Sequence, residues 1–227
     1  MRARTLTENL IQLTRAHFVN AYLVREDDGF TLIDTTLPGA AQAFTKAAEA
    51  AGGAIRRIAL THGHGDHSGS VDALKSALGG EAQTLFPDLD ARILAGDTLT
   101  GNKPKGNWPS LGTTPDVKLT GGERVGSLEV FAAPGHTPGH VAFLDTRDQT
   151  LIAGDVFTSY GRVAVTSTFY WRFPFATMGT SDREQNLQTA ERLRALQPRL
   201  LAVGHGPATT KPSQAMERAI RAIGASG

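Results

Sequence analysis

Apolar positions in the first part of the chain fall into short runs that alternate with helical patterns. The runs at 17–24 and 30–35 flank the turn-forming residues 26–29, which predicts a β-hairpin. Residues 38–51 then place apolar side chains at helical spacing and end at a pair of glycines, which predicts a helix. The apolar run at 55–60 predicts a further strand.

The next stretch continues this alternation with a weaker pattern. A second helix is expected at 68–78, where apolar side chains share one face and two glycines follow. Between residues 81 and 107 we expect only a short helix at 92–99 and an exposed loop at 101–106.

Beyond residue 117 the period of the apolar positions falls towards two. Short strands are expected at 117–119, 123–125, 128–132, 140–144 and 150–153. Ser181 and Glu184 form a capping-box signature for a helix that reaches residue 197, with Leu187, Ala190, Leu193 and Leu196 facing inward. A strand at 200–203 and a helix at 212–223 complete the chain.

Strands come first and an outer helix later in each half of this order. The order favours two sheets packed face to face with helices outside, although other layered α/β arrangements share it. A chain of 227 residues is long enough to bury a sizeable core, and we expect a single domain, 1–227.

Composition excludes several classes of function. The formal net charge is +1 and Lys and Arg form no long block, so a nucleic-acid partner is not expected. Cysteine is absent, which excludes disulfides, zinc–thiolate sites and thiol nucleophiles. No stretch approaches the roughly 20 apolar residues that cross a bilayer. We therefore expect a cytoplasmic location and do not expect a membrane partner.

The densest chemistry follows directly after the run at 55–60. His62, His64, Asp66 and His67 lie within six residues, separated by two glycines and preceding the expected second helix. We expect these glycines to allow backbone conformations that a β-carbon would forbid, so that the turn can wrap around metal ions. The alternative is an ordinary polar loop, which gives no role to so dense a group of histidines.

Three more ligand-type residues each follow an apolar strand and a glycine. These are His136, Asp155 and His205. A polar side chain just past a buried strand lies at the rim of a sheet, where loops from several strands converge. With the cluster they make seven groups, which is the number that two adjacent divalent ions need.

With these motifs the chain resembles the metallo-β-lactamase superfamily over nearly its whole length. The resemblance rests on Asn20-Ala-Tyr-Leu23, Leu32-Ile-Asp34, the His-Gly-His-Gly-Asp-His cluster, Gly135-His-Thr-Pro-Gly-His140, Gly154-Asp155 and Gly204-His205. It implies an α+β fold, a four-layer αβ/βα sandwich of two mixed sheets with a metal site at one edge. By the family's pattern the first metal is held by His62, His64 and His136, the second by Asp66, His67 and His205, and Asp155 bridges them.

Nitrogen and oxygen ligands without sulfur suit Zn²⁺ and also accept iron or manganese. Two such ions leave a net positive field that stabilises a bridging hydroxide, whose parent water titrates near about pH 7. We expect Asp66, besides ligation, to be catalytic, accepting a hydrogen bond from the hydroxide or passing a proton to the leaving group.

Other residues near the motifs invite interpretation. The Pro and Gly between His136 and His140 exclude a helical pair, and we favour a hydrogen-bonding role for His140 over ligation. Asp34 is expected either to orient a ligand histidine or to cap a turn. His17 is expected at the surface. Residues 166–180 concentrate aromatics around Arg172, and we expect a loop that lines the substrate pocket or packs against a partner subunit.

The resemblance implies a hydrolase that acts on a small ester, thioester or lactone, as a monomer or homodimer. True β-lactamases of the family lack a carboxylate at the position of Asp155, and lactonases often carry Tyr where this chain has Thr158. Glyoxalase II adds a helical domain that this chain does not match. The alternatives are a persulfide-dioxygenase-like enzyme with one iron on His62, His136 and Asp155, or β-lactamase-like or phosphodiesterase activity.

Overall fold

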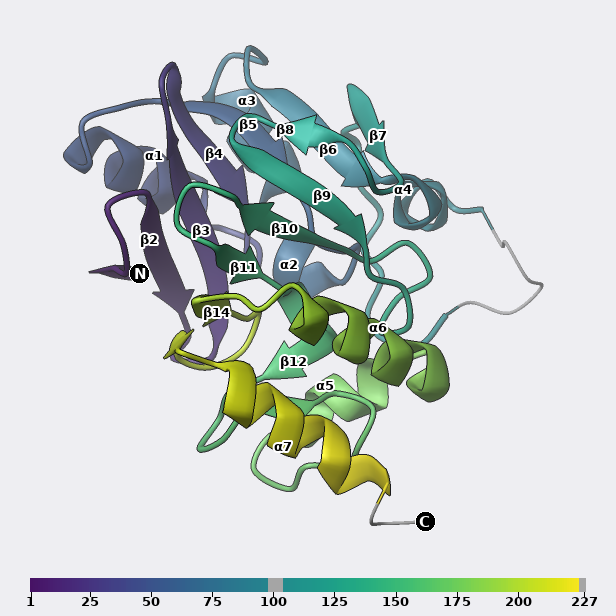
Figure 1. The fold of residues 1–227 in the computed structure, drawn as a ribbon. Helices are drawn as coiled ribbons and strands as arrows, with labels where there is room; N and C mark the ends of the chain where they lie inside the picture. The colour runs from purple at the N-terminus through teal and green to yellow at the C-terminus, as the bar shows by residue number, and fades with distance from the viewer. Residues whose placement is uncertain (98–103, 225–227) are drawn as a thin grey trace. The chain divides into compact units, whose positions relative to one another are not determined.

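Residues 1–97 and 104–224 are described by the computed structural model of the chain (Figure 1). One unit takes in the described residues of Met1–Gly101 and Asn107–Leu119, and the other takes in those of Asn102–Gly106 and Thr120–Gly227. Within the described part of the chain, no helix is both long enough and apolar enough to cross a membrane.

The first unit is built on a seven-stranded mixed sheet whose strands follow sequence order. They are β1 (Arg2–Thr5), β2 (Leu10–Arg15), β3 (Val19–Glu26), β4 (Gly29–Ile33), β5 (Ile55–Ala59), β6 (Gln83–Pro87) and β7 (Val117–Leu119). The first four strands pair antiparallel and the last four pair parallel. The expected hairpin is confirmed, because β3 and β4 pair from Glu26 and Gly29 onward.

Helices α1 (Ala41–Ala50) and α3 (Val71–Ala77) pack on this sheet (Figure 1). Phe44 and Leu74 from these helices lie in one core cluster with Leu32 and Ile58 of the strands, all of them fully buried. Burial of such side chains contributes about 1.5–3 kcal/mol each, which holds the helices to the sheet.

The expected helix at 68–78 is interrupted in the structure. Its first part belongs to the short helix α2 (Gly65–Ser68), and α3 begins only at Val71. Gly69 N donates to Thr36 O, and Ser70 Oγ donates to Leu37 O and accepts from Ala40 N. These bonds to the segment before α1 take the place of the continuing helical ladder.

Other differences in this unit concern short elements. Strands β1, β2 and β6 were not expected, because their apolar runs are short and their pairing comes from neighbouring strands. The expected helix at 92–99 is observed as α4 (Asp88–Leu94), which begins directly after β6. Residues 98–103, with part of that helix and of the expected loop at 101–106, lie outside the described residues.

The second unit has a six-stranded mixed sheet and a two-stranded one. The order of the larger sheet is β15 (Thr209–Thr210), β14 (Leu200–Ala202), β11 (Thr150–Ile152), β10 (Val141–Asp145), β9 (Leu128–Ala132) and β8 (Arg124–Val125). The smaller sheet pairs β12 (Phe157–Thr158) with β13 (Ala164–Val165). Strands β12, β13 and β15 were not expected.

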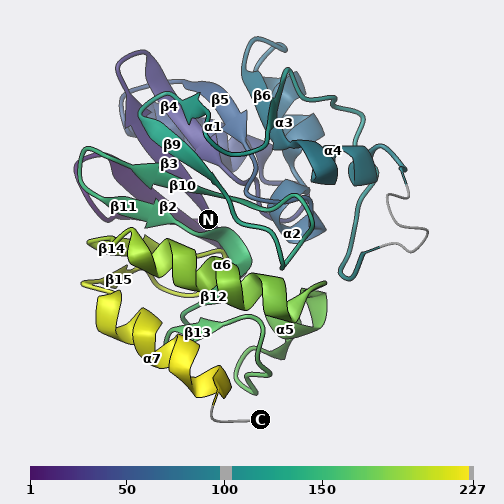
Figure 2. The ribbon, with the colours of Figure 1, turned by 45° about the vertical axis from the view of Figure 1, so that its right-hand side comes forward.

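Helices α6 (Arg183–Ala195) and α7 (Ser213–Gly224) run next to each other and share a core with the strands (Figure 2). Ala190 and Leu193 of α6 are buried as expected, whereas Leu187 and Leu196 are only partly buried. Asn186 and Thr189 take buried positions instead, because Asn186 Nδ2 donates to Thr166 Oγ1 and Thr189 Oγ1 donates to Pro134 O.

The N-terminus of α6 corrects the expected capping box. Asp182 is the N-cap and its side chain accepts from Gln185 N at 2.9 Å, one position later than the expected Ser181. A third helix, α5 (Pro174–Gly179), lies inside the segment that we expected to be a loop. Proline at its first position favours this start, since a helix leaves that N–H without a partner.

Candidate metal centre

Four of the seven predicted ligands lie together in the first unit, two on the connection from β5 to α2 and two on α2 itself. This first half-set consists of His62, His64, Asp66 and His67. The ring of His62 lies 4.8 Å from that of His64 and 4.2 Å from that of His67, measured between centroids. The three histidines are buried, and the side chain of Asp66 is 32% exposed.

Gly63 and Gly65 let this segment pack closely against its neighbours. The expected reason for these glycines was an unusual backbone conformation. Neither Gly63 nor Gly65 has a positive φ. A β-carbon at Gly63 would instead lie 2.6 Å from Cζ3 of Trp108, and one at Gly65 would lie 2.9 Å from Nδ2 of Asn107. The expectation of an unusual backbone conformation is therefore wrong, and the small size of glycine is what these positions require.

Asp34 orients two of the imidazoles from the end of β4. Its Oδ2 accepts from Nδ1 of His67 at 2.8 Å and from Oγ1 of Thr61 at 2.8 Å. The Thr61 hydroxyl gives its hydrogen to Asp34, so its oxygen is the acceptor for Nδ1 of His62 at 3.0 Å. Both rings then carry the proton on Nδ1 and keep a lone pair on Nε2. The prediction that Asp34 orients a histidine is confirmed.

Two further residues support the first half-set, and sequence reasoning missed both. The ring of Trp108 lies 5.0 Å from that of His64 in an edge-on contact. Oδ2 of Asp90, which is fully buried in α4, accepts from the backbone N–H of Gly63 at 2.9 Å. Neither residue stands beside a metal-ligand motif in the sequence, so only the folded chain reveals these contacts.

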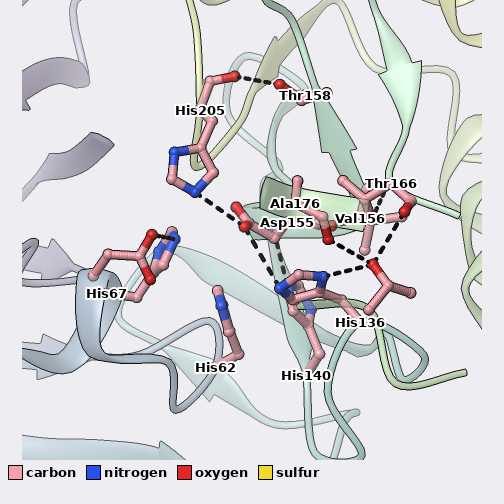
Figure 3. A network of polar contacts seen from close by, with 12 residues as sticks. His62, His67, His136, His140, Asp155, Val156, Thr158, Thr166, Ala176 and His205 are labelled. Atoms are coloured by element: carbon pink, nitrogen blue, oxygen red, sulfur yellow. Dashed lines mark hydrogen bonds and ion pairs between the residues drawn. The ribbon is translucent and has the colours of Figure 1, made fainter. Parts of the chain in front are cut away.

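The remaining predicted ligands lie together in the second unit and form the second half-set: His136, Asp155 and His205. Oδ2 of Asp155 lies 3.5 Å from Nε2 of His136 and 3.1 Å from Nε2 of His205 (Figure 3). All three side chains are buried. Each follows a strand, β9, β11 and β14 respectively, which agrees with the expectation that they lie at strand ends.

Two residues position His136: Thr180, directly after α5, and the preceding Gly135. Oγ1 of Thr180 shares its one hydrogen between the carbonyl oxygens of Thr166 and Ala176, so it accepts from Nδ1 of His136 at 3.0 Å. The preceding Gly135 has φ of +133°, and a β-carbon there would overlap the backbone of Asn186. Glycine is therefore required both for the conformation and for the close approach of α6.

His140 and Thr158 fix the backbone around the second half-set. Nε2 of His140 accepts from the backbone N–H of Asp155 at 3.1 Å, which confirms the hydrogen-bonding role expected for this histidine. Oγ1 of Thr158 donates to His205 O at 3.1 Å (Figure 3). His17, which was expected at the surface, is exposed.

Aromatic residues of the 166–180 segment divide between the interior and the surface. The ring of Phe173 lies 4.6 Å from that of His205 and stacks on Tyr160 at 5.1 Å. Burial raises the pKa of the Tyr160 hydroxyl. Phe169, Trp171 and Phe175 are each at least 65% exposed. One face of the segment therefore packs on a predicted ligand, and the other is accessible.

The donors of both half-sets fit divalent transition metals. His62, His67 and His136 each have Nδ1 hydrogen-bonded to an oxygen, so that each directs Nε2 away from that partner. Metal-ligating histidines almost always carry such a partner on the other nitrogen. The three rings are thus oriented as metal ligands would be, and Asp66 and Asp155 add carboxylate oxygens.

Comparison with known proteins gives a match over most of the chain. The family model described as the metallo-beta-lactamase superfamily matches residues 14–205. The uncharacterized protein YobT of Bacillus subtilis (strain 168) is 43% identical, with the match covering 89% of each chain. The hydroxyacylglutathione hydrolase of Rhodospirillum rubrum is 29% identical over 69% of this chain and 50% of its own length.

Solved structures give the same fold. TTHA1623 in a di-iron-bound form is 28% identical, with a TM-score of 0.66 over 89% of this chain and 94% of its own. The metallo-beta-lactamase from Pontibacter korlensis has a TM-score of 0.72 at 16% identity, over 97% and 98% of the two chains. The expected α+β sandwich fold with two mixed sheets is confirmed.

Proposed function

The chain belongs to the metallo-β-lactamase superfamily, and from this premise we propose that it is a metal-dependent hydrolase of a small ester, thioester or lactone. The observation that carries the proposal is the state of the buried imidazoles. His62, His67 and His136 have Nδ1 bonded to oxygen acceptors and so keep Nε2 for a ligand. Metal-ligating histidines almost always have such an oxygen partner on the other ring nitrogen.

We propose that the two half-sets serve the same pair of divalent ions, as the superfamily's ligand pattern implies. His62, His64 and His136 would hold the first ion, Asp66, His67 and His205 would hold the second, and Asp155 would bridge them. Zinc suits this nitrogen and oxygen donor set, and iron or manganese also fits it. When bound, such ions supply Lewis acidity and lower the pKa of a coordinated water.

The side chains of the chain then have separate tasks in the proposed reaction. Asp34, Thr61 and Thr180 hold the ligand imidazoles in the tautomer that leaves Nε2 unprotonated. Asp66 is the more exposed of the two ligand carboxylates, so its carboxylate oxygen can accept the proton of the attacking water. No side chain has to form a covalent bond with the substrate.

The proposed substrate class follows from the relatives. Several proteins named hydroxyacylglutathione hydrolase match 62–69% of this chain, which favours a thioester or a related acyl compound. These matches span half or less of the relatives' own lengths, so the substrate site of those enzymes is not carried over. Phe173 beside His205 offers an apolar surface at the second half-set for the acyl group.

A substrate panel offered to one metal-loaded preparation tests this proposal. The panel contains a thioester, a lactone, a phosphodiester, a β-lactam and a persulfide with oxygen. We expect hydrolysis of the thioester or lactone that stops after chelation and returns with added metal. His136→Ala should abolish it, whereas His17→Ala at the exposed histidine should leave it unchanged. Oxygen consumption with the persulfide, at one iron per chain, would establish the oxygenase alternative instead.

A further inference from the structure

The second unit contains a pocket that none of the seven predicted ligands lines. The loop from β12 to β13, strand β13, helix α7, the segment 168–170 and residues Pro207 and Thr209 line a volume of about 670 Å³. Helix α7 packs next to β13 in this unit (Figure 2). Pockets of this size accommodate small organic molecules.

The floor of the pocket is apolar. Val163, Val165 and Ala219 line it, and all three are buried members of the core that joins β13 to α7. Phe169, whose side chain is 65% exposed, and Tyr170 add aromatic surface. Such walls favour a ligand that removes apolar area from water.

Two cationic side chains, Arg162 and Arg218, line the same pocket, which has no acidic lining residue. Within the described ranges, 1–97 and 104–224, neither guanidinium forms an ion pair. The Arg162 guanidinium lies over the Tyr170 ring, 5.1 Å from its centroid. Both arginines are largely exposed, so they can turn towards an anion at little cost.

From this combination we propose that the pocket binds an anionic amphiphile, a molecule with one acidic head group and an apolar body. The head group would be held between Arg162 and Arg218, since a guanidinium binds carboxylate or phosphate through paired hydrogen bonds. The apolar body would cover Val163, Val165 and Ala219. This site goes beyond the proposed hydrolase activity and does not depend on it.

Ligand binding at this pocket would also reach the second half-set through Ser159 and Pro207, which line it. Oγ of Ser159 donates to Pro207 O at 2.6 Å, and N of Ser159 donates to His205 O at 3.0 Å. The pocket wall is therefore tied to the backbone of a predicted metal ligand. Binding is nevertheless measurable without any assay of activity.

Calorimetric titration of the full chain with decanoate, kept below its micelle concentration, tests the proposal. We expect saturable binding of one decanoate per chain. Arg162→Gln and Arg218→Gln should each weaken it about tenfold, the usual effect of losing one charge-assisted hydrogen bond. Ala222→Trp, an exposed position on α7 that lines the pocket, should block binding by filling the mouth.

The matched control is Arg221→Gln. Arg221 lies on the same helix and pairs with Glu217, but it does not line the pocket, so its removal changes the net charge equally and should leave binding unchanged. Uncharged decanol should bind more weakly than decanoate. Absence of saturable decanoate binding, equal binding of decanol, or equal losses in the Arg221 variant would each overturn the proposal.

Discussion

The carboxylate of Asp34 orients two histidine rings through a single oxygen atom. Its Oδ2 accepts directly from His67 and, through the hydroxyl of Thr61, sets the tautomer of His62. Its Oδ1 accepts from the backbone N–H of Thr61, which ties the same loop to the end of β4. One buried side chain thus prepares both Nε2 atoms.

Asp34→Asn should weaken metal binding by about 10- to 100-fold, the usual effect of losing a partner of a ligating histidine. The amide offers one oxygen where the carboxylate offers two, so at least one of the three present donors loses its acceptor. Competition with a chelating dye measures the change in affinity.

Asp28→Asn provides the matched control for this variant. It is the same substitution, made at an aspartate whose side chain is 52% exposed and pairs with Arg57. It should leave metal affinity unchanged. Equal affinities of the Asp34 variant and the wild-type protein would show that the carboxylate does not orient the ligands.

At the scale of elements, the connection from β5 to α2 depends on how little space its glycines occupy. Gly63 faces the side chain of Trp108, whereas Gly135 in the second unit faces the backbone of Asn186. A side chain can move aside more easily than a packed backbone. The two glycines should therefore respond differently to substitution.

Gly63→Ala should destabilise the protein by about 1–3 kcal/mol, as expected for an overpacked site. In a Trp108→Leu background the same substitution should cost clearly less, because the atom that the new methyl group meets has been removed. Urea unfolding of the four proteins in a double-mutant cycle measures the coupling.

Gly135→Ala should show no such relief in the Trp108→Leu background, since its obstacle is the backbone of α6 and its φ is positive. A cost of Gly63→Ala that is the same in both backgrounds would contradict the packing explanation. The presence of glycine at position 63, where φ is not positive, would then have no physical explanation.

The hydrogen bonds between Thr84 of β6 and Asp116, the residue before β7, make the free energy of unfolding depend on pH. The backbone N–H of Thr84, then its hydroxyl, then the ammonium of Lys75 hold the pKa of Asp116 at about 2, well below its ordinary value. A lowered pKa stabilises the folded state above the ordinary value, near 4, and this contribution is lost as the pH falls towards 2.

Asp116→Asn should therefore cost of the order of 1 kcal/mol at pH 7, a figure reduced for solvent screening of a half-exposed side chain. The difference from the wild-type protein should vanish between about pH 4 and pH 2. Urea unfolding at pH 7, 4 and 2.5 measures it. A difference that stays constant over this range would exclude the ionised carboxylate as the cause.

Longer elements were predictable because their apolar periodicity and their end signals agree. The helix around Phe44, the hairpin that turns before Gly29 and the strand before His62 were expected close to their observed positions. Strands such as β12 and β15 have two residues each, and only pairing partners from elsewhere in the chain define them. A helix end such as Asp182 depends on which of two adjacent candidates makes the hydrogen bond.

At the scale of the whole molecule, the sequence predicted the half-sets better than their surroundings. His136, Asp155 and His205 could be selected because each follows an apolar strand and a glycine, and the structure brings them together. Trp108 and Asp90 could not, since a buried aromatic contact or a carboxylate bound to a backbone N–H leaves no local pattern. Local motifs indicate candidate ligands, and tertiary packing decides which side chains support them.

Metal content per chain tests the central claim most directly: the proposal that His67 of the first half-set and His205 of the second hold the same ion of a pair. Elemental analysis after saturation with zinc and gel filtration should give about two ions in the wild-type protein and in His17→Ala. His67→Ala and His205→Ala should each retain about one, and the double variant should retain about one as well, because both ligands belong to the same ion. Two ions retained in either single variant, no ion retained in the double variant, or none in the wild-type protein, would contradict the account.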